Sequence, residues 1–211
     1  MKLFFIFLFY FPGLLFCQNP DFTKLKAGDV LLLPLRCQLC SAISDESNSP
    51  YSHSAVAFKW EEKWVVVEAL GSVRSVSLNE FIKRSSGAAP IKILRLKSLA
   101  KLMKDDPDFE RELNSKGQKK FAEKFLGLTF DHQFLWDNTD SGGAETYYCS
   151  EFVAKFLNTF SEVHPKISPL PMSFKKDWDF WQNFFEGHIP EGELGLSPGD
   201  LERSDQFLSV Q

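Results

Sequence analysis

One cysteine stands where the sequence predicts the start of an amphipathic helix. The segment TYYCSEFVAKFLNTF places apolar side chains at helical spacing, and Cys149 shares their face in the first turn of a helix expected from about Tyr148 to Phe160. There the helix dipole and the free backbone N–H groups favour a thiolate and could receive an oxyanion. A buried core cysteine at a helix start explains this segment equally well. Cys149 is therefore a candidate nucleophile that needs partners.

Two groups that could assist a thiol lie on a predicted β-hairpin. The residues on either side of the turn EEK are β-branched and aromatic, which indicates two paired strands. If Trp60 pairs with Lys63, then His53 and Glu68 are diagonal neighbours on one face of the hairpin. A shift of one residue would separate them onto different faces. Taken alone, His53 could be a capped or surface histidine and Glu68 a solvent-facing strand end.

A thiol, an imidazole and a carboxylate together can perform nucleophilic catalysis. The imidazole accepts the thiol proton, and the carboxylate fixes its tautomer and stabilises the imidazolium that forms. The small residues Ala55 and Ala57 share the predicted face of His53 and are expected to leave room for a helix start to dock there. We therefore predict Cys149 as nucleophile, His53 as general base and Glu68 as the group that orients the base.

The N-terminus has the composition of an export signal. Lys2 precedes an almost unbroken apolar stretch from Leu3 to Phe16, and as a helix this stretch spans only ~21 Å of the ~30 Å hydrocarbon core. We predict a signal peptide at residues 1–17, cleaved after Cys17, and a single domain at residues 18–211 that is exported to the periplasm or secreted. Lipid anchoring at Cys17 is the alternative, and only then would the protein associate with a membrane.

Removal of the signal would leave three cysteines, so one thiol would be unpaired. Cys37 and Cys40 have the spacing of a redox or metal half-site, but no histidine elsewhere offers a second pair of ligands at suitable spacing. We therefore predict no metal and no cofactor, and favour a structural role for the two cysteines, either reduced or disulfide-bonded. A direct disulfide would leave Cys149 as the odd thiol.

Strand patterns occur early in the chain and helix patterns late, which favours an α+β fold with an antiparallel sheet packed against helices. Strands are expected at residues 30–35, 54–60, 64–68, 73–76 and 91–96, and helices at about 77–84, 98–103, 115–126, 148–160 and 173–185. The first of these helices opens with a capping box, Ser77 to Glu80. The tail from Ile189 onward is rich in Gly, Pro and charge and is expected to be an extended surface segment.

Bulk composition restricts the classes of partner. Hydrophobic residues make up 44% of the chain and charged residues 25%, a globular balance that excludes a disordered or collagen-like protein. The net charge is −4, and no run of Lys and Arg forms a stripe long enough to follow phosphates. Nucleic acid is therefore not an expected partner.

Several short blocks occur in an order that resembles one enzyme family. KAGDVLLLP, YSHSAVAF, VVVEALG, SLNEFIKR and YYCSEFVAKFL follow one another as in the YiiX/YebB-like branch of the NlpC superfamily, and the ending IPEGELGLSPGDLERSDQFLSV is also similar. The resemblance implies a circularly permuted papain-like fold, in which the histidine and the acid precede the cysteine. It also implies the triad Cys149, His53 and Glu68. The predicted substrate-binding residues are Tyr148, Ser54 and Tyr51.

The function expected from these observations is that of an exported cysteine hydrolase cleaving an amide or peptide bond, with peptidoglycan stem peptides as the expected substrate. The loop at 131–146 contains Gly142-Gly143 and is expected to form one wall of an open groove, which suits a short peptide. The aromatic helix from Trp178 to Phe185 could instead roof an apolar pocket, as a thioesterase or a lipid acyl hydrolase or transferase would need. A non-catalytic binding module on the same scaffold is the third alternative.

Overall fold

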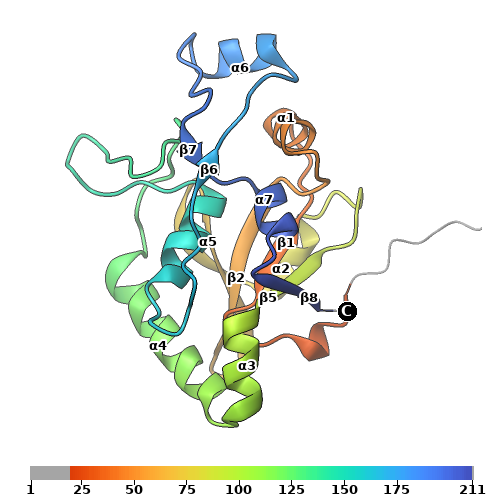
Figure 1. Cartoon of the computed structure of the whole chain (residues 1–211), viewed down its shortest axis with the longest axis vertical. Coiled ribbons are helices and arrows are strands. Elements are labelled where there is room, and N and C mark those ends of the chain that lie inside the picture. The colour runs from red at the N-terminus through yellow and green to blue at the C-terminus, as the bar shows by residue number, and fades with distance from the viewer. Residues whose placement is uncertain (1–19, 211) are drawn as a thin grey trace, which may run out of the picture.

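The centre of the molecule is a six-stranded antiparallel sheet. The computed structural model describes residues 20–210, and the strands of the sheet follow the order β4-β3-β2-β1-β5-β8 (Figure 1). Two short strands, β6 and β7, pair separately. The strands are β1 (Val30–Leu33), β2 (His53–Trp60), β3 (Lys63–Leu70), β4 (Ser72–Ser77), β5 (Lys92–Leu96), β6 (Leu170–Pro171), β7 (Leu194–Gly195) and β8 (Phe207–Val210).

Helices surround this sheet and extend beyond it at one end. They are the 3₁₀ turn η1 (Phe22–Lys24) and the helices α1 (Gln38–Ser47), α2 (Leu78–Lys83), α3 (Lys97–Asp105), α4 (Phe109–Lys124), α5 (Cys149–Asn158), α6 (Trp178–Phe184) and α7 (Pro198–Arg203). In Figure 1, α3 and α4 lie toward one end of the long axis, and α6 lies at the other end, near α1. The predicted α+β class with an antiparallel sheet is confirmed.

The β2–β3 hairpin has the predicted register. Trp60 pairs with Lys63, and the pairing continues along both strands. The turn residues Glu61 and Glu62 have φ angles of 47° and 63°, and positive φ at both central positions gives the kind of two-residue turn that matches the twist of paired strands. Because side chains alternate along each strand, this register decides which residues of β2 and β3 share a face.

The two faces of β2 pack against different helices. On one face, Phe58 meets Phe156 of α5 edge-on, with ring centroids 5.6 Å apart. On the other face, Ala55 and Ala57 pack in a cluster with Phe81 of α2. The prediction that these alanines leave room for the cysteine-bearing helix is therefore wrong. Successive strand residues point to opposite faces, and α5 docks on the Phe58 face.

Helix α4 begins at Phe109, earlier than the predicted start at residue 115. Its buried residues recur every fourth position, which produces one continuous stripe against the sheet. They are Phe109, Leu113, Gly117 and Phe121. Gly117 lies so close to the Phe58 ring that a Cβ atom there would overlap it. The glycine therefore sets the distance between α4 and the sheet.

The aromatic helix is shorter than predicted, because it begins at Trp178 instead of Ser173. The backbone N–H of Phe174 donates a hydrogen bond to the carboxylate of Glu191 at 2.7 Å. The backbone N–H of Met172 donates to the carbonyl of Glu193, the residue before β7, at 2.8 Å. These contacts hold the segment before Trp178 in an extended course along β7, so the helix starts only after it.

The prediction of an extended surface tail is wrong for its last part. Ser197 and Asp200 form a capping box that starts α7, and the residues after α7 form β8. In β8, Leu208 pairs with Arg95 of β5, so the C-terminal strand completes one edge of the sheet (Figure 1). Glycine and proline suggested an irregular segment, but Pro198 occupies the first turn of α7, where its missing N–H is not needed.

The close approach at Gly117 gives a stability prediction. Alanine favours a helix over glycine by about 1 kcal/mol, yet in Gly117→Ala the new methyl must displace the fully buried Phe58 ring. We expect a net loss of about 1–3 kcal/mol in the free energy of unfolding, measured by urea denaturation. The control is Ser115→Ala, on the exposed side of the same helix, which should leave the free energy of unfolding nearly unchanged. A stabilised Gly117→Ala protein would contradict this packing.

Candidate active site

Cys149 is the first residue of α5 and lies where that helix meets the sheet. The residue is only 8% exposed and is the one free cysteine within residues 20–210. Helix α5 packs on β2 and β3 through a fully buried face that includes Phe152 and Phe156. This docking brings the thiol to the end of the sheet at which β2 begins. The helix N-terminus contributes free backbone N–H groups, which favour a thiolate.

His53 and Glu68 are in direct contact beside this cysteine. The Nε2 atom of His53 lies 2.7 Å from Oε2 of Glu68, and the two residues are 1% and 0% exposed. The hairpin register produces this contact, because both side chains emerge on the same face at the open end of the hairpin. With Nε2 engaged by the carboxylate, the other ring nitrogen of His53 is left to serve the thiol, and Cys149 is close enough to raise the pKa of the imidazole.

Two arginines hold the carboxylate of Glu68 from its other sides. Arg74 Nε donates to Oε1 at 3.1 Å, and Arg84 Nη2 donates to Oε2 at 2.7 Å. Burial raises the pKa of Glu68, but the hydrogen bonds and positive charges of His53 and Arg84 outweigh it and lower the pKa to about 2. The carboxylate is therefore negatively charged at any physiological pH.

Sequence reasoning missed both arginines. Arg74 lies directly opposite Glu68 in the pairing of β3 with β4. A prediction of the register of this second hairpin would therefore have identified it as a partner of Glu68. Arg84 is the C-cap of the helix that the Ser77 capping box begins. Its position beside Glu68 depends on how α2 packs back against the sheet, which no local pattern encodes.

The thiol and the imidazole have the protonation states of a reactive pair. Burial lowers the pKa of His53, but hydrogen bonds to Cys149 and Glu68 and their negative charges raise it from 6.5 to about 9. Burial raises the pKa of Cys149, but the hydrogen bond and charge of His53, together with contacts from Ser54, bring it below its ordinary value. The arrangement thus favours a thiolate next to an imidazolium, as in cysteine hydrolases.

The three predicted substrate-binding residues have different positions. Tyr148 lines the cavity next to Cys149, and its hydroxyl accepts a hydrogen bond from the backbone N–H of Leu196 at 2.9 Å. Ser54 is fully buried and lies against the cysteine sulfur, outside the cavity wall. Tyr51 is not part of the wall either, because its ring is packed in the main core and its hydroxyl donates to the Pro90 carbonyl at 3.0 Å.

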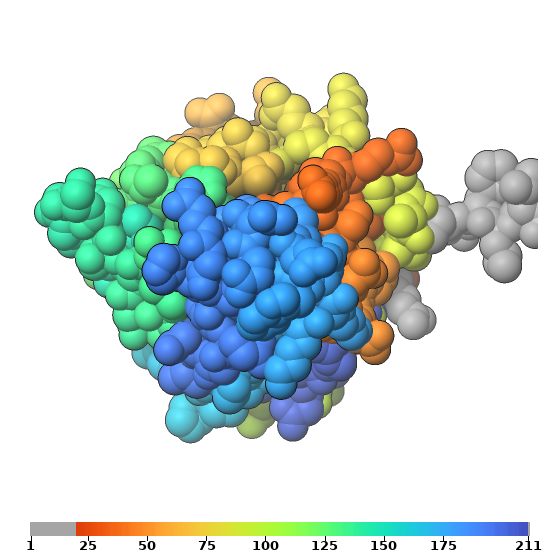
Figure 2. Space-filling view, turned by 90° about the horizontal axis from the view of Figure 1, so that it is seen from above, coloured from red at the N-terminus to blue at the C-terminus, as the bar shows by residue number. Residues whose placement is uncertain are grey.

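A cavity of about 530 Å³ opens beside Cys149 and His53, a size that suits a small-molecule or acyl ligand. Most of its wall is apolar. The residues that enclose it from α1, from the 131–146 loop and from the segments near β6 and α6 are Leu39, Ile43, Phe134, Met172, Phe174 and Trp181. Figure 2 shows the α6 region lying over this end of the molecule beside α1. The aromatic helix therefore roofs the cavity.

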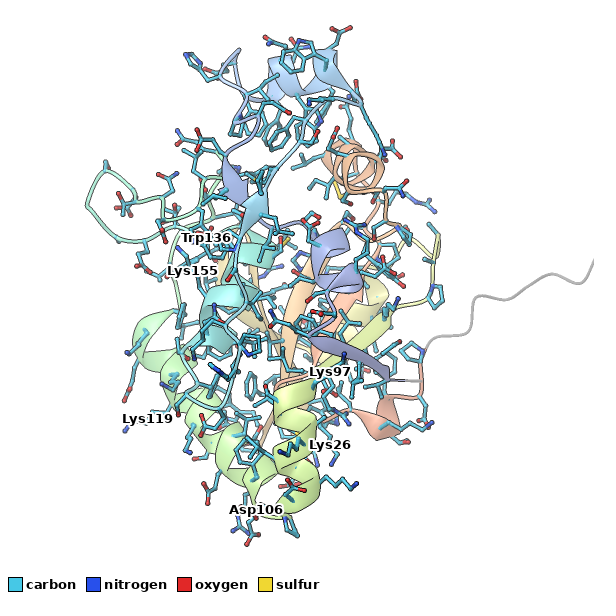
Figure 3. The ribbon with its side chains drawn as sticks, in the orientation of Figure 1. Lys26, Lys97, Asp106, Lys119, Trp136 and Lys155 are labelled. Carbon is cyan, nitrogen blue, oxygen red and sulfur yellow. A yellow bond between two sulfur atoms is a disulfide. The ribbon has the colours of Figure 1, made fainter. Side chains whose placement is uncertain are left out.

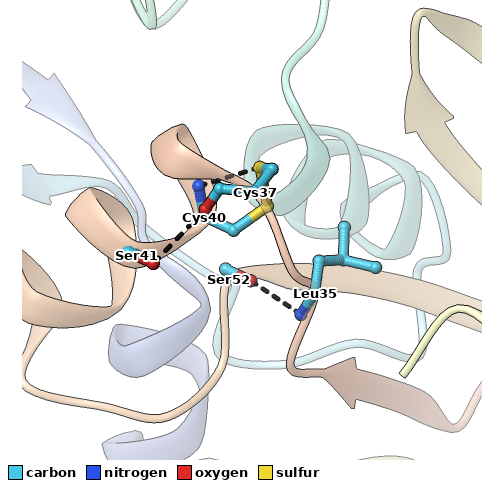
Figure 4. The surroundings of a disulfide bond; sticks show 5 residues. All are labelled: Leu35, Cys37, Cys40, Ser41 and Ser52. Carbon is cyan, nitrogen blue, oxygen red and sulfur yellow. Dashed lines mark hydrogen bonds between the residues drawn. A yellow bond between two sulfur atoms is a disulfide. The ribbon is translucent and has the colours of Figure 1, made fainter. Parts of the chain in front are cut away.

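A disulfide between Cys37 and Cys40 forms part of the same wall (Figure 4). Cys37 is the N-cap of α1, and its sulfur accepts a hydrogen bond from the Cys40 backbone N–H at 3.0 Å. Close to it, the backbone N–H of Leu35 donates to the Ser52 hydroxyl at 3.0 Å. The sequence left open whether these two cysteines are reduced or disulfide-bonded, and the structure has them bonded. Among the cysteines of residues 20–210, Cys149 is then the unpaired thiol.

The loop at 131–146 differs from the expected wall of an open groove. The buried carboxylate of Asp131 accepts two backbone N–H groups of the loop at 2.8 Å each, which is a turn-organising role. Lys155 of α5 lies over the Trp136 ring, 5.1 Å from its centroid (Figure 3). The loop is thus fixed against α5, and its contribution to the cavity wall is the buried ring of Phe134.

A solved structure from Escherichia coli O157:H7, described as the metalloprotein yiiX, has a similar fold. Its TM-score is 0.68 at 20% identity, and the match covers 92% of this chain and 98% of that one. Within residues 20–210 no group of three or more His, Cys, Asp or Glu side chains could hold a metal ion. The carboxylate of Glu68, beside Cys149 and His53, already accepts hydrogen bonds from His53 and two arginines. The side chains of the described part of the chain therefore do not fit a metal centre.

Sequence comparisons give a consistent result. No curated protein sequence matches the chain at a significant level. Residues 24–207 match the model of a family described as permuted papain-like amidase enzymes, YaeF/YiiX, C92 family. The match includes Cys149, His53 and Glu68, and it spans every element from β1 to α7. By its sequence and its fold, this chain belongs to the permuted papain-like amidase family.

Proposed function

We propose that this protein hydrolyses an amide bond with Cys149 as nucleophile, His53 as general base and acid, and Glu68 as the carboxylate that orients the base. The observation that carries the proposal is the buried array of these three side chains at the edge of the cavity. Membership of an amidase family supports the type of bond. A structural cysteine would not need a charged imidazole and a charged carboxylate, both of which are costly to bury.

The geometry suits a two-step reaction. The Cys149 thiolate attacks the carbonyl carbon, and the oxyanion forms near the backbone N–H groups at the start of α5. His53 then gives its proton to the departing amine as the C–N bond breaks, which leaves a thioester on Cys149. In the second step His53 removes a proton from water, the hydroxide attacks the thioester, and the released thiolate and imidazolium restore the starting state.

The cavity favours a substrate with a sizeable apolar group. The larger part of its wall is aromatic and aliphatic and offers no hydrogen-bond partner to a polar, charged stem peptide. Charged side chains also line it, namely Arg36, Glu46, Arg84, Asp200 and Arg203. We therefore propose that the acyl or the amine side of the amide carries an aliphatic or aromatic group that fills the space beneath Phe174 and Trp181. A peptidoglycan peptide, which the sequence alone suggested, is the competing outcome of the substrate test below.

A second candidate function is supported by the same cavity. An enzyme that forms a thioester on Cys149 can equally cleave an ester or thioester of an apolar acid, or pass the acyl group to an acceptor other than water. The enclosed apolar space beside Cys149 is the specific observation in favour of an acyl hydrolase or transferase. The amide bond has priority because of the family to which the chain belongs.

We also propose that the protein is exported. The predicted signal peptide at residues 1–17 and Cys17, the alternative lipid attachment site, lie outside the described residues. The Cys37–Cys40 disulfide supports an oxidising compartment, where such bonds persist. Among residues 20–210, no helix has the length and apolar character to cross a membrane.

The protonation states predict the pH dependence of kcat/KM. The active form needs the Cys149 thiolate, which exists above the lowered pKa of the thiol, and the imidazolium, which exists below about 9. We expect a bell-shaped profile with its alkaline limb near pH 9. Cys149→Ala should remove all turnover. A variant that kept wild-type turnover would contradict the nucleophile and leave the binding-module alternative.

Replacement of Glu68 tests the orienting carboxylate. In Glu68→Gln the imidazole loses a negative partner, so we expect kcat to fall about 100-fold or more and the alkaline limb of the pH profile to move to lower pH. Glu123→Gln, on the exposed surface of α4, is the control. A large loss of thermal stability with an unchanged rate would mean that Glu68 has a structural role alone.

The cavity predicts selectivity for apolar substrates. With N-acyl amides of increasing chain length, kcat/KM should rise until the chain fills the cavity. Met172→Trp narrows the space and should weaken this dependence, while short acyl amides keep their rate. Lys119→Met, on the far side of α4, is the control. Turnover of muropeptides with none of the acyl amides would contradict the proposed substrate class.

A further inference from the structure

The hydroxyl of Ser54 is buried and has no conventional partner. Ser54 follows His53 at the start of β2, and the residue is 0% exposed. Within the described part of the chain, its Oγ atom has no hydrogen-bond partner, whether oxygen, nitrogen or sulfur. A buried hydroxyl without a partner destabilises the folded state. A buried donor without an acceptor is therefore expected only where it has a functional role that offsets its cost in stability.

The group beside this hydroxyl is the sulfur of Cys149. The backbone N–H and the hydroxyl of Ser54 lie beside this sulfur and lower the pKa of the thiol, although the hydroxyl does not have hydrogen-bond geometry to it in this structure. The alternation along β2 explains the arrangement. His53 extends toward Glu68, on the face that packs against α2, whereas the next residue points to the face on which α5 docks. Consecutive residues thus approach the sulfur from two directions.

We propose that Ser54 is a catalytic residue, whose unpaired hydroxyl turns toward the Cys149 sulfur when it ionises and, with the Ser54 backbone N–H, donates hydrogen bonds that hold the thiolate before attack. The inference rests on the proposed function, because it deepens the role of the same nucleophile. No proton is transferred from Ser54. Its two donors stabilise negative charge on a sulfur that is otherwise removed from water, and a thiolate needs such donors when it is buried.

A sulfur that loses a donor should ionise at higher pH. The test follows the rate at which iodoacetamide alkylates Cys149 between pH 4 and 10 in the full native chain, without reductant, by peptide mass mapping. Only the thiolate reacts, so the midpoint of the rate reports its formation. For Ser54→Ala we expect the midpoint to rise by about one unit, which is a rate about tenfold lower at pH values below it.

Two further variants make this result specific. Ser54→Thr keeps a hydroxyl at the same position and should return the midpoint toward that of the wild type. Thr146→Val removes another buried hydroxyl that has no partner within residues 20–210 and should not change the midpoint. The thermal unfolding temperature of each variant is measured in parallel, so that a general loosening of the site is recognised.

An unchanged midpoint in a stably folded Ser54→Ala protein would overturn the proposal. Loss of the fold in this variant would also count against it, because the hydroxyl would then be structural. Alkylation needs no substrate, so its outcome is independent of the proposed reaction. If Ser54→Ala raises the midpoint but Cys149→Ala keeps full hydrolytic activity, the role of Ser54 is supported and the proposed function is contradicted. If Ser54→Ala leaves the midpoint unchanged but Cys149→Ala abolishes hydrolysis, the proposed function is supported and the role of Ser54 is contradicted.

Discussion

The buried carboxylate of Glu68 is the interaction on which the site depends. A charge with no exposure to water is stable only when other groups replace its hydration, and here His53, Arg74 and Arg84 do so from separate elements. Strands β2, β3 and β4 and the end of α2 must therefore all be in place for the charge to be accommodated. The same ion cluster that restrains these elements fixes the imidazole and its protonation.

The second constraint is the docking of α5 on the sheet. Phe58 and Phe156 form the contact that places the helix on the face opposite Glu68, so the thiol reaches the imidazole around the end of β2 instead of across one face. This explains why His53, which begins its strand, can serve both sides. It lies beyond the last residues of β2 that pair with β3, with the carboxylate of Glu68 on one side of its ring and the sulfur on the other. It also explains why the next residue, Ser54, faces the sulfur.

Sequence patterns predicted correctly those features that depend on residues close together in the chain. The register of the β2–β3 hairpin, the capping box at Ser77 and the helix that begins at Cys149 all depend on residues a few positions apart. The errors share another cause. Which face of β2 receives α5, the return of the C-terminal residues as β8, and the approach of Arg84 to Glu68 are set by packing between segments far apart in the chain, and no short pattern records that packing.

The roof of the cavity is built separately from the catalytic array. Trp181, Phe174 and Phe185 pack with Phe134 in an aromatic cluster of their own, distinct from the two clusters on the faces of the sheet. Tyr148 belongs to that cluster and directly precedes Cys149, so it connects the aromatic roof to the array of Cys149, His53 and Glu68. His53 and Arg84 line the cavity, but no residue of the ion cluster around Glu68 belongs to this aromatic cluster. The roof can therefore change in shape while the charges beside Cys149 keep their positions. Under the proposed function, substrate selection therefore depends on the aromatic roof and bond cleavage on the array beside Cys149, which are different parts of the fold.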